Sequence, residues 1–297
     1  MTEYFTTREL AALLRVKERK VYDLVSANAL PVRRVTGKLL FPKEEIEAWI
    51  AASAGERLSE PKAVVPTGRL PLIMAGGHDL LLEWALKESR SGIAALLDGA
   101  LDGLARFRGS GCLAAGLHIP EDGLETWNVA AVEDAVGGEP VVLIEWAKRT
   151  RGLMYRPSAG RTIRTLADIG RLRFQSRQPE AGSELILTAL LAQAGMEKSD
   201  VECVEAIERS ETDLAMAIGG GRADIGLGIE AAARQLQLDF TPLIVERFDL
   251  LVWRKAYFDP PFQKLMQFCQ SETFRNRAAA IGGYDCTSLG AVHFNGP

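Results

Sequence analysis

The chain has 297 residues, of which 47% are hydrophobic and 25% charged, and its formal net charge is −4. This length allows two or three domains, and the composition is that of a soluble globular protein. No apolar run approaches the ~18 residues of a membrane span, and the N-terminus lacks the apolar segment of a secretory signal. The cysteines lie far apart without CxxC spacing, which argues against structural zinc and a disulfide framework, so we expect a cytoplasmic protein.

Charge is distributed unevenly along the chain. Residues 1–50 contain nine Lys or Arg and seven Asp or Glu, so this segment carries +2 and the rest of the chain −6. The asymmetry indicates a small basic module attached to an acidic body. We divide the chain into a small N-terminal domain at 1–52, a linker rich in Pro, Gly and charged residues at 53–69, and a large domain at 70–297.

The first segment predicts a helix-turn-helix followed by a hairpin. A helix begins at Thr6 or Thr7 with an acidic residue in its first turn, and a second helix ends near Asn28. The stretch LPVRRVTGKLLFP alternates apolar and polar residues around Thr36-Gly37, which is typical of a hairpin. KEEIEAWIA then predicts a third amphipathic helix.

The stretch from TTRELAALL to FPKEEIEAWI resembles the winged helix-turn-helix of the excisionase and MerR-like families over about 45 residues. The resemblance implies that the second helix enters the major groove and that the hairpin, as a wing, follows the phosphates. The alternative is that these cations form only a solvated face. Because +2 is weakly basic, we expect a homodimer or higher homo-oligomer that reads two half-sites. The candidate DNA-binding residues are Thr7, Lys17, Arg19, Lys20, Tyr22, Arg33, Arg34 and Lys38.

After the linker, buried strands alternate with helices, which predicts an α/β domain with parallel sheets. The predicted helices include LLLEWALKES, ELILTALLAQAG and ETDLAMAIGG. The predicted strands are LPLIMA, IAALLD, CLAAGLHI, VVLIEW, GLMY, LRFQS, VECVEA, ADIGLGI and TPLIVERFDLLVW. GSGCLAAG at 109–116 and GRADIGLG at 221–228 each follow a helix and lead into a strand, which suggests two related lobes.

Motifs spread over residues 70–255 resemble a periplasmic-binding-protein-like family: GGHDLLLEW, DGALDGLARFRGSGCLAAGLHIPE, SRQPEAGSELIL and AIGGGRADIGLGIEAAARQLQLDFTPLIVERFDLLV. The fold that this implies is a type II binding domain, similar to LysR effector domains and molybdate-binding proteins. It has two lobes, two crossover strands at VVLIEW and TPLIVERFDLLVW, and a ligand between them. Glu184 stands where some relatives carry an Arg that would suit an anion directly.

Three loops of small residues each precede a predicted helix, and we expect them to converge on one cleft. Glycine allows a ligand to approach the backbone, and a helix N-terminus presents free N–H groups and a positive dipole end to an anion. Each loop alone is equally explained as a tight turn with a cap, with Asp79 or Ser183 as N-cap. The loop residues are Gly76, Gly77, His78 and Asp79, then Asp98, Gly99 and Ala100, and finally Glu180, Ala181, Gly182 and Ser183.

Five further positions complete the candidate ligand site or its surroundings. Asn128 bonds the ligand or caps a helix, and Arg156 and Arg177 pair with an anion or form surface ion pairs. Gly228 lies on a strand beside the hinge, and His118 is expected to be structural, as His78 alone would be.

These features predict a ligand-responsive transcriptional regulator, with an oxyanion such as molybdate or tungstate, or a molybdenum-cofactor-related molecule, as the ligand suggested by the resemblance. The alternative is a cytosolic binding or scaffold protein whose helix-turn-helix contacts other proteins. We expect no enzyme, cofactor, metal or membrane partner, because GxSxG, HExxH and P-loop motifs are missing from the sequence.

Overall fold

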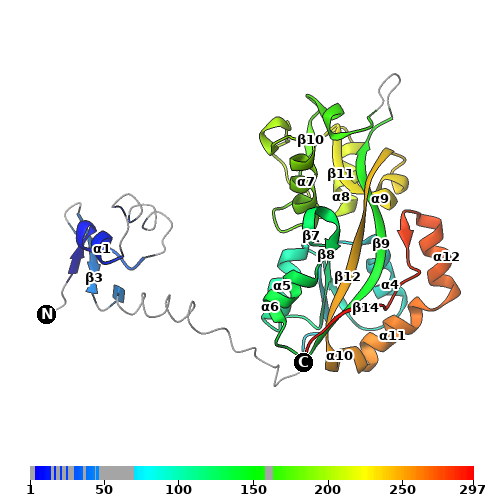
Figure 1. Cartoon of the computed structure of the whole chain (residues 1–297), viewed down its shortest axis with the longest axis horizontal. Coiled ribbons are helices and arrows are strands. Elements are labelled where there is room, and N and C mark those ends of the chain that lie inside the picture. The colour runs from blue at the N-terminus through cyan, green and yellow to red at the C-terminus, as the bar shows by residue number, and fades with distance from the viewer. Residues whose placement is uncertain are drawn as a thin grey trace. The chain divides into compact units, whose positions relative to one another are not determined.

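The computed structural model describes residues 4–14, 17, 21, 25, 30–35, 38–43, 45–46, 70–157 and 163–297 (Figure 1). The chain divides into two compact units, Met1–Lys62 and Ala63–Pro297. Within the described parts of the chain, every helix is too short or too polar to cross a membrane.

The N-terminal unit contains a three-stranded antiparallel sheet in the order β1-β3-β2. Thr6 caps the first helix, because its backbone N–H donates to Glu9 Oε2 at 2.8 Å while Glu9 N donates to Thr6 Oγ1 at 3.4 Å. The predicted cap and the predicted hairpin β2–β3 are confirmed, whereas the short strand β1 was not predicted. The described elements are β1 (Tyr4–Thr6), α1 (Thr7–Leu13), β2 (Arg33–Val35) and β3 (Lys38–Pro42).

A small apolar core holds this unit together. Leu10, Val21, Phe41 and Ile46 are fully buried, and they come from all parts of the module. Val21 and Val25 lie in helical backbone, as expected for the inner face of the second helix. Most of the second and third predicted helices lies outside the described residues.

The second unit is built on a mixed sheet of nine described strands, whose main path runs β10-β11-β9-β12-β6-β4-β5 (Figure 1). Its strands are β4 (Ile73–Gly76), β5 (Ala94–Leu96), β6 (Ala114–Leu117), β9 (Val141–Tyr155), β10 (Phe174–Gln175), β11 (Ile225–Ile229), β12 (Asp239–Trp253), β13 (Tyr284–Asp285) and β14 (Val292–Asn295). A separate two-stranded sheet pairs β7 (Pro120–Glu121) with β8 (Thr126–Trp127).

The two longest strands, β9 and β12, have 15 residues each and pair antiparallel from Asp239↔Tyr155 to Trp253↔Val141. They run through both lobes (Figure 1), so the predicted crossover strands are confirmed in position. The prediction of parallel sheets was wrong in this respect, because VVLIEW and GLMY belong to the single strand β9, which runs antiparallel to its neighbours.

The remaining β pairing matches the expectation of two related lobes. In the first lobe β4 pairs parallel with β5 and β6, and in the second β10 pairs parallel with β11. Residues 109–116 lead into β6 beside β12, and residues 221–228 lead into β11 beside β9, so the two echoing segments occupy equivalent places. VECVEA was wrongly predicted as a strand; there Cys203 forms only an isolated bridge to Phe174.

Helices cover the sheet on both sides of each lobe (Figure 1). The first lobe carries α4 (Leu80–Glu88), α5 (Ala100–Arg108), α6 (Val129–Val136), α10 (Arg254–Phe258), α11 (Pro260–Cys269) and α12 (Glu272–Ile281). The second lobe carries α7 (Gly182–Gln193), α8 (Glu211–Gly219) and α9 (Glu230–Gln235). Short 3₁₀ turns lie at Asp122–Leu124, Leu166–Ile169 and Lys198–Asp200.

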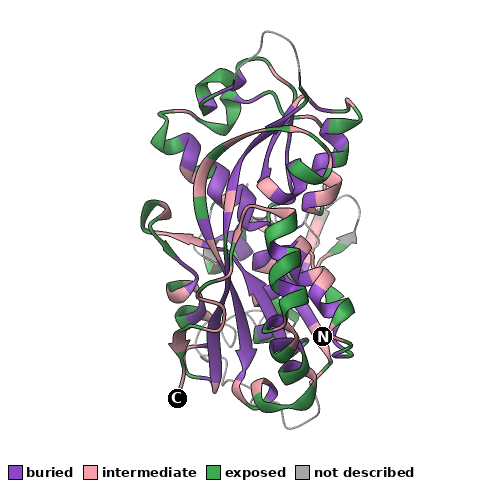
Figure 2. Ribbon diagram, turned by 90° about the vertical axis from the view of Figure 1, so that its right-hand side faces the viewer, coloured by how far each residue is buried: buried purple, intermediate pink, exposed green. Residues whose placement is uncertain are grey.

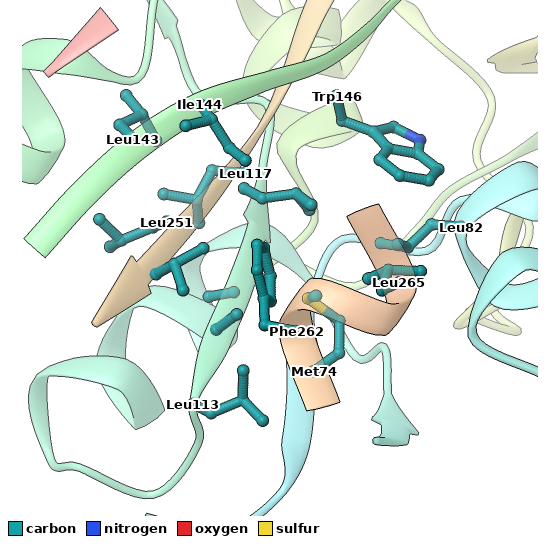
Figure 3. Close-up of a cluster of buried hydrophobic side chains, with 14 of the residues drawn as sticks. Met74, Leu82, Leu113, Leu117, Leu143, Ile144, Trp146, Leu251, Phe262 and Leu265 are labelled. Atoms are coloured by element: carbon teal, nitrogen blue, oxygen red, sulfur yellow. The ribbon is translucent and has the colours of Figure 1, made fainter. Parts of the chain in front are cut away.

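Buried residues follow the central strands, while the outer helix surfaces are exposed (Figure 2). The largest apolar cluster lies in the first lobe, where Met74, Leu117 and Phe262 pack between the sheet and the C-terminal helices (Figure 3). The second lobe has its own clusters around Ile186 and Leu214. Each lobe thus has its own buried cluster or clusters, while Ile281 and Tyr284 pack against clusters of both lobes.

Candidate functional site

The three small-residue loops predicted from the sequence meet at the junction between the lobes. Gly99 N donates to Gly76 O at 2.9 Å, which joins the first two loops within the first lobe. Leu101 N donates to Glu180 O at 3.0 Å, which connects them to the loop before α7 in the second lobe. The structure therefore brings the three loops together, and their role in lining a ligand cleft stays a prediction.

Glycine is required here because the backbones approach closely. Gly99 adopts φ +125°, and a Cβ on it would stand 2.8 Å from Glu180 O. A Cβ on Gly77 would stand 2.8 Å from His118 Nε2, and one on Gly182 would stand 2.7 Å from His118 Cε1. The imidazole of His118 thus fills the space between one glycine of each lobe.

Direct polar contacts connect the two lobes around this point. Glu211 N, at the start of α8, donates to His78 Nδ1 at 3.2 Å, and His78 Nε2 then donates to Glu83 at 3.3 Å. At the rim, Arg209 forms a bidentate ion pair with Asp98, with nitrogen–oxygen distances of 2.8 and 2.7 Å. The structure therefore represents a closed arrangement of the lobes.

A cluster of buried ions lies behind the loops, on the crossover strands. Arg151, on β9, donates from Nε to Glu246 Oε2 and from Nη2 to Glu246 Oε1, both at 2.9 Å. The same Nη2 also donates to Glu211 Oε1 at 2.9 Å. Arg149 Nη1 donates to Asp79 Oδ2 at 2.9 Å, and Arg149 Nη2 lies 2.6 Å from Glu246 Oε1. These side chains are essentially unexposed, so each charge depends on its partners for solvation.

Glu211 and Glu246 remain ionised despite their burial. Burial alone would raise the pKa of Glu211, but attraction to Arg151 and Arg177 outweighs it and lowers the pKa to about 2. Burial would likewise raise the pKa of Glu246, but attraction to Arg149 and Arg151 outweighs it and holds this pKa well below its usual value. Burial lowers the pKa of His118, so its neutral ring donates Nδ1–H to Glu246 at 3.0 Å.

Several buried donors at the junction have no hydrogen-bond partner among the described residues. They are Arg149 Nε, Arg151 Nη1, Arg177 Nη1, Ser176 Oγ and Ser183 Oγ. Buried donors without acceptors are costly, and a group that accepts hydrogen bonds would satisfy them.

Arg177, predicted as an anion partner, lies in this region. It is 5% exposed, and its other N–H groups donate to the carbonyls of Glu208 and Arg209 at 2.9 Å. Burial lowers its pKa from the ordinary arginine value. Its Nη1 lies 3.3 Å from Glu211 Oε1 without forming a hydrogen bond.

The helix N-termini differ in how they are capped. Asp79 is the N-cap of α4 and accepts from Leu82 N at 2.6 Å, and it also accepts from Trp146 and Tyr284. The N-cap of α7 is Ala181, which provides no side-chain cap. Predicting Ser183 as that N-cap was wrong, because Ser183 lies inside the first turn of α7. Ala100 begins α5 after Gly99, another residue without a capping side chain.

Three other predicted residues lie away from the loop junction or are engaged elsewhere. Asn128 is fully buried; it accepts from Ile119 N at 2.6 Å and donates to Asp249 at 2.8 Å, so its amide is used within the first lobe. Arg156 lies at the opposite end of β11, where it forms a partly exposed ion pair with Asp224 at 3.1 Å. Gly228 lies beside α8, where a Cβ would meet Met154 Cε at 2.1 Å.

Glu184 does not take the place of an anion-binding arginine. Its Oε1 accepts from Arg177 N at 2.8 Å and its Oε2 from Lys198 Nζ at 2.5 Å. It therefore fixes the loop that leads into α7.

Sequence reasoning missed Arg149, Arg151, Glu211 and Glu246. A signal was present, because charged residues interrupt the apolar strands at EWAKRTRGLMY and IVERFDLLV, and buried strands otherwise read as continuous apolar runs. Their pairing could not be predicted from the sequence, since Arg149 and Arg151 lie nearly a hundred residues before their shared partner Glu246.

The predicted DNA-binding residues are only partly described. Thr7 begins α1, Lys17 is exposed, and Arg33 on β2 pairs with Glu45 at 2.8 Å. Arg34 and Lys38 lie on the two strands of the hairpin, at positions close to its turn. Arg19, Lys20 and Tyr22 lie outside the described residues.

A helix-turn-helix domain in the same chain as a two-lobed α/β domain of the binding-protein type indicates a ligand-responsive DNA-binding regulator, and both domains are supported by family matches. Residues 83–270 match the family model of the PBP superfamily domain, and residues 4–54 match that of a helix-turn-helix domain. The chain belongs to the PBP superfamily domain family.

The chain is similar to several known proteins in sequence or in fold. The chain is 26% identical to the uncharacterized protein YvgK of Bacillus subtilis over 98% of both chains. The phosphate-bound structure of a putative phosphate ABC transporter substrate-binding protein from Clostridium perfringens has a TM-score of 0.52 at 10% identity, covering 72% of this chain and 98% of that one. An H₂O₂-bound OxyR variant of Corynebacterium glutamicum has a TM-score of 0.48 at 14% identity, covering 93% and 89%.

Proposed function

We propose that this protein is a cytoplasmic transcriptional regulator that binds a small oxyanion between the lobes of its second unit and DNA through its first. The observation that carries the ligand proposal is the set of buried donors without acceptors, above all Arg151 Nη1, Arg177 Nη1 and Ser183 Oγ. An oxyanion accepts hydrogen bonds on every side, and guanidinium groups suit it geometrically. Molybdate, tungstate and a molybdenum-cofactor-related molecule are the candidates from the sequence resemblance.

The three glycine-rich loops supply the rest of the proposed site. Gly77 with His78, Gly99 with Ala100, and Ala181 with Gly182 bring backbone from both lobes to one place, and α7 adds a helix N-terminus without a side-chain cap. A ligand there contacts both lobes at once. It can therefore shift the balance between open and closed forms, provided that it binds the two forms with different affinities.

A homodimer or higher homo-oligomer would convert this shift into a change at DNA. One weakly basic module makes few phosphate contacts, whereas two modules on adjacent half-sites double them. Lobe closure would then alter the spacing at which the paired modules are presented. The proposal assigns ligand binding to the second unit and no catalytic turnover.

A thermal-shift screen of the full chain tests the ligand proposal. Molybdate, tungstate, sulfate and phosphate are each added against a chloride background, and a true ligand raises the melting temperature with its concentration. A raised midpoint with one of these oxyanions supports the proposal. An unchanged midpoint with all four rejects the oxyanion.

Salt-dependent retention on duplex DNA tests the proposed DNA binding by the N-terminal unit. A DNA-binding protein loses affinity steeply as salt rises, because counterions compete for the phosphates. A flat response would favour the alternative of a scaffold whose helix-turn-helix contacts proteins.

A further inference from the structure

Glu211 occupies the surroundings that an external anion would need. It is 1% exposed and begins α8, directly after the capping residue Ser210. Its Oε1 lies 2.9 Å from Arg151 Nη2 and 3.3 Å from Arg177 Nη1, and its Oε2 accepts from Ile229 N at 3.3 Å. Two guanidinium groups, a backbone N–H and a helix N-terminus thus surround one carboxylate.

The Glu211 carboxylate leaves some of these donor N–H groups without a hydrogen bond. Arg177 Nη1 comes close to it without forming a hydrogen bond, and Arg151 Nη1 has no partner among the described residues. A tetrahedral oxyanion presents more acceptor oxygens than a carboxylate and can reach donors that Glu211 leaves unsatisfied.

Charge balance makes Glu211 a competitor for such a ligand. Arg149, Arg151 and Arg177 are matched in the buried cluster by Asp79, Glu211 and Glu246. An added anion would leave this cluster negatively charged as long as Glu211 remained in place. Uncompensated buried charge is strongly unfavourable, so an entering anion and the Glu211 carboxylate exclude each other.

We propose that Glu211 is an internal anion that holds Arg151 and Arg177 in the absence of ligand and is displaced by the oxyanion. This inference rests on the proposed oxyanion site and adds a residue that sets its affinity.

Displacement would also reach the first lobe. The backbone N–H of Glu211 donates to His78 Nδ1, one of the direct contacts between the lobes. Moving the carboxylate out of the cluster shifts the first turn of α8 and so disturbs this bond. Replacement of the Glu211 carboxylate by the bound oxyanion would thereby change the contact between the lobes.

The test compares anion binding by the full chain and its Glu211→Gln variant, by calorimetric titration and thermal shift with sodium molybdate and sodium sulfate. Glutamine keeps the size and removes the charge. We expect a lower melting temperature without anion, its recovery on addition of anion, and an apparent Kd lower than that of the wild type by about tenfold or more.

Glu230→Gln is the matched control, since Glu230 also begins a helix of the second lobe but pairs with the exposed Arg234 at 2.7 Å. The Glu230→Gln variant should bind molybdate and sulfate with the same affinity as the wild type. If Glu211→Gln does not fold, Glu211→Ala replaces it, because alanine also removes the charge and leaves space beside both arginines. Tighter binding than the wild type is again expected.

The outcomes separate this inference from the proposed function. Wild-type binding that the Glu211 variants leave unchanged or weaken overturns the inference and keeps the oxyanion site. Binding by the variants alone supports the internal anion but removes the oxyanion as the wild-type ligand. An absence of binding by every protein rejects both.

Discussion

Gly182, at the start of α7 in the second lobe, lies against the imidazole ring of His118 in the first lobe. A Cβ at position 182 would stand 2.6 Å from the His118 carbonyl oxygen and 2.7 Å from its Cε1. Because the backbone carbonyl cannot rotate away as a side chain could, this contact requires glycine as long as the lobes are closed.

We therefore expect Gly182→Ala to open the junction. Overpacking of this kind costs about 1–3 kcal/mol, and here the lobes can relieve it by moving apart. Small-angle scattering should show a larger radius of gyration, and chemical denaturation a lower free energy of unfolding. Gly138→Ala is the control, since a Cβ there meets no atom within 4 Å. Equal scattering curves for the two variants would contradict a steric role for Gly182.

Glu246→Gln should destabilise the second unit strongly. The substitution removes the carboxylate that pairs with Arg149 and Arg151, leaving buried positive charge without compensation. Breaking one side of a buried ion pair costs about 3–5 kcal/mol, measurable by urea denaturation. Asp102→Asn, which breaks a partly exposed pair with Arg106, should change stability by about 0–1 kcal/mol. Similar losses in both variants would show that the cluster is not compensated as described.

Asp249 should give stability a distinct dependence on pH. Burial raises its pKa from 3.8 to about 6, even though Arg247 and Asn128 favour the charged form. Between about pH 4 and 6 the native state therefore holds a proton that the unfolded chain has released, so this stabilising contribution is lost as pH rises through 6.

The Asp249→Asn variant removes that dependence. Relative to the wild type, the variant should gain about 2–3 kcal/mol as pH rises from 4 to 7. Urea denaturation at four pH values in this range measures the difference. Asp285→Asn, at an exposed position, provides the control. A constant difference between Asp249→Asn and the wild type would show that Asp249 titrates normally.

The hairpin of the N-terminal unit should contribute phosphate contacts. Arg34 and Lys38 lie on β2 and β3 close to the turn, where a wing would meet the DNA backbone. The double variant Arg34→Ala with Lys38→Ala should weaken binding to any duplex sequence. It should also reduce the slope of log affinity against log salt by about 2. Lys148→Ala in the second unit should leave that slope unchanged.

The periodicity of the sequence predicted many of the helices and strands, whereas the two-lobed arrangement was predicted from the resemblance to binding-protein-like domains. Helices such as α4 and α8 have a recognisable sequence pattern, because an acceptor side chain at the N-cap is followed by apolar residues at helical spacing. The glycines at 77, 99 and 182 indicated where backbones approach. The direction of the long strands was not predictable, because an apolar run reads the same in parallel and antiparallel pairing.

The buried ion cluster is the part of the candidate site that could not be predicted from the sequence. Arg149 and Arg151 stand at alternate positions along β9, as exposed residues of an edge strand would. The local sequence does not distinguish these buried arginines from exposed ones. Only the pairing of β9 with β12 and the approach of α8 bring Glu246 and Glu211 to them. Conversely, Arg156 has the residue type of an anion partner but lies at the wrong end of its strand.

The paired strands β9 and β12 also determine which motions are open to the second unit. β13 and β14 add further hydrogen-bonded partners to β9 between Val142 and Arg149, so that half of the ribbon is stiffened. The register shift between Pro242 and Ile244 lies beyond them, opposite Arg151 and Gly152. Because β11 pairs with β9 at Arg151 and Gly152, and a second register shift lies between Phe248 and Asp249, we expect the lobes to reorient by twisting of the ribbon between these two shifts.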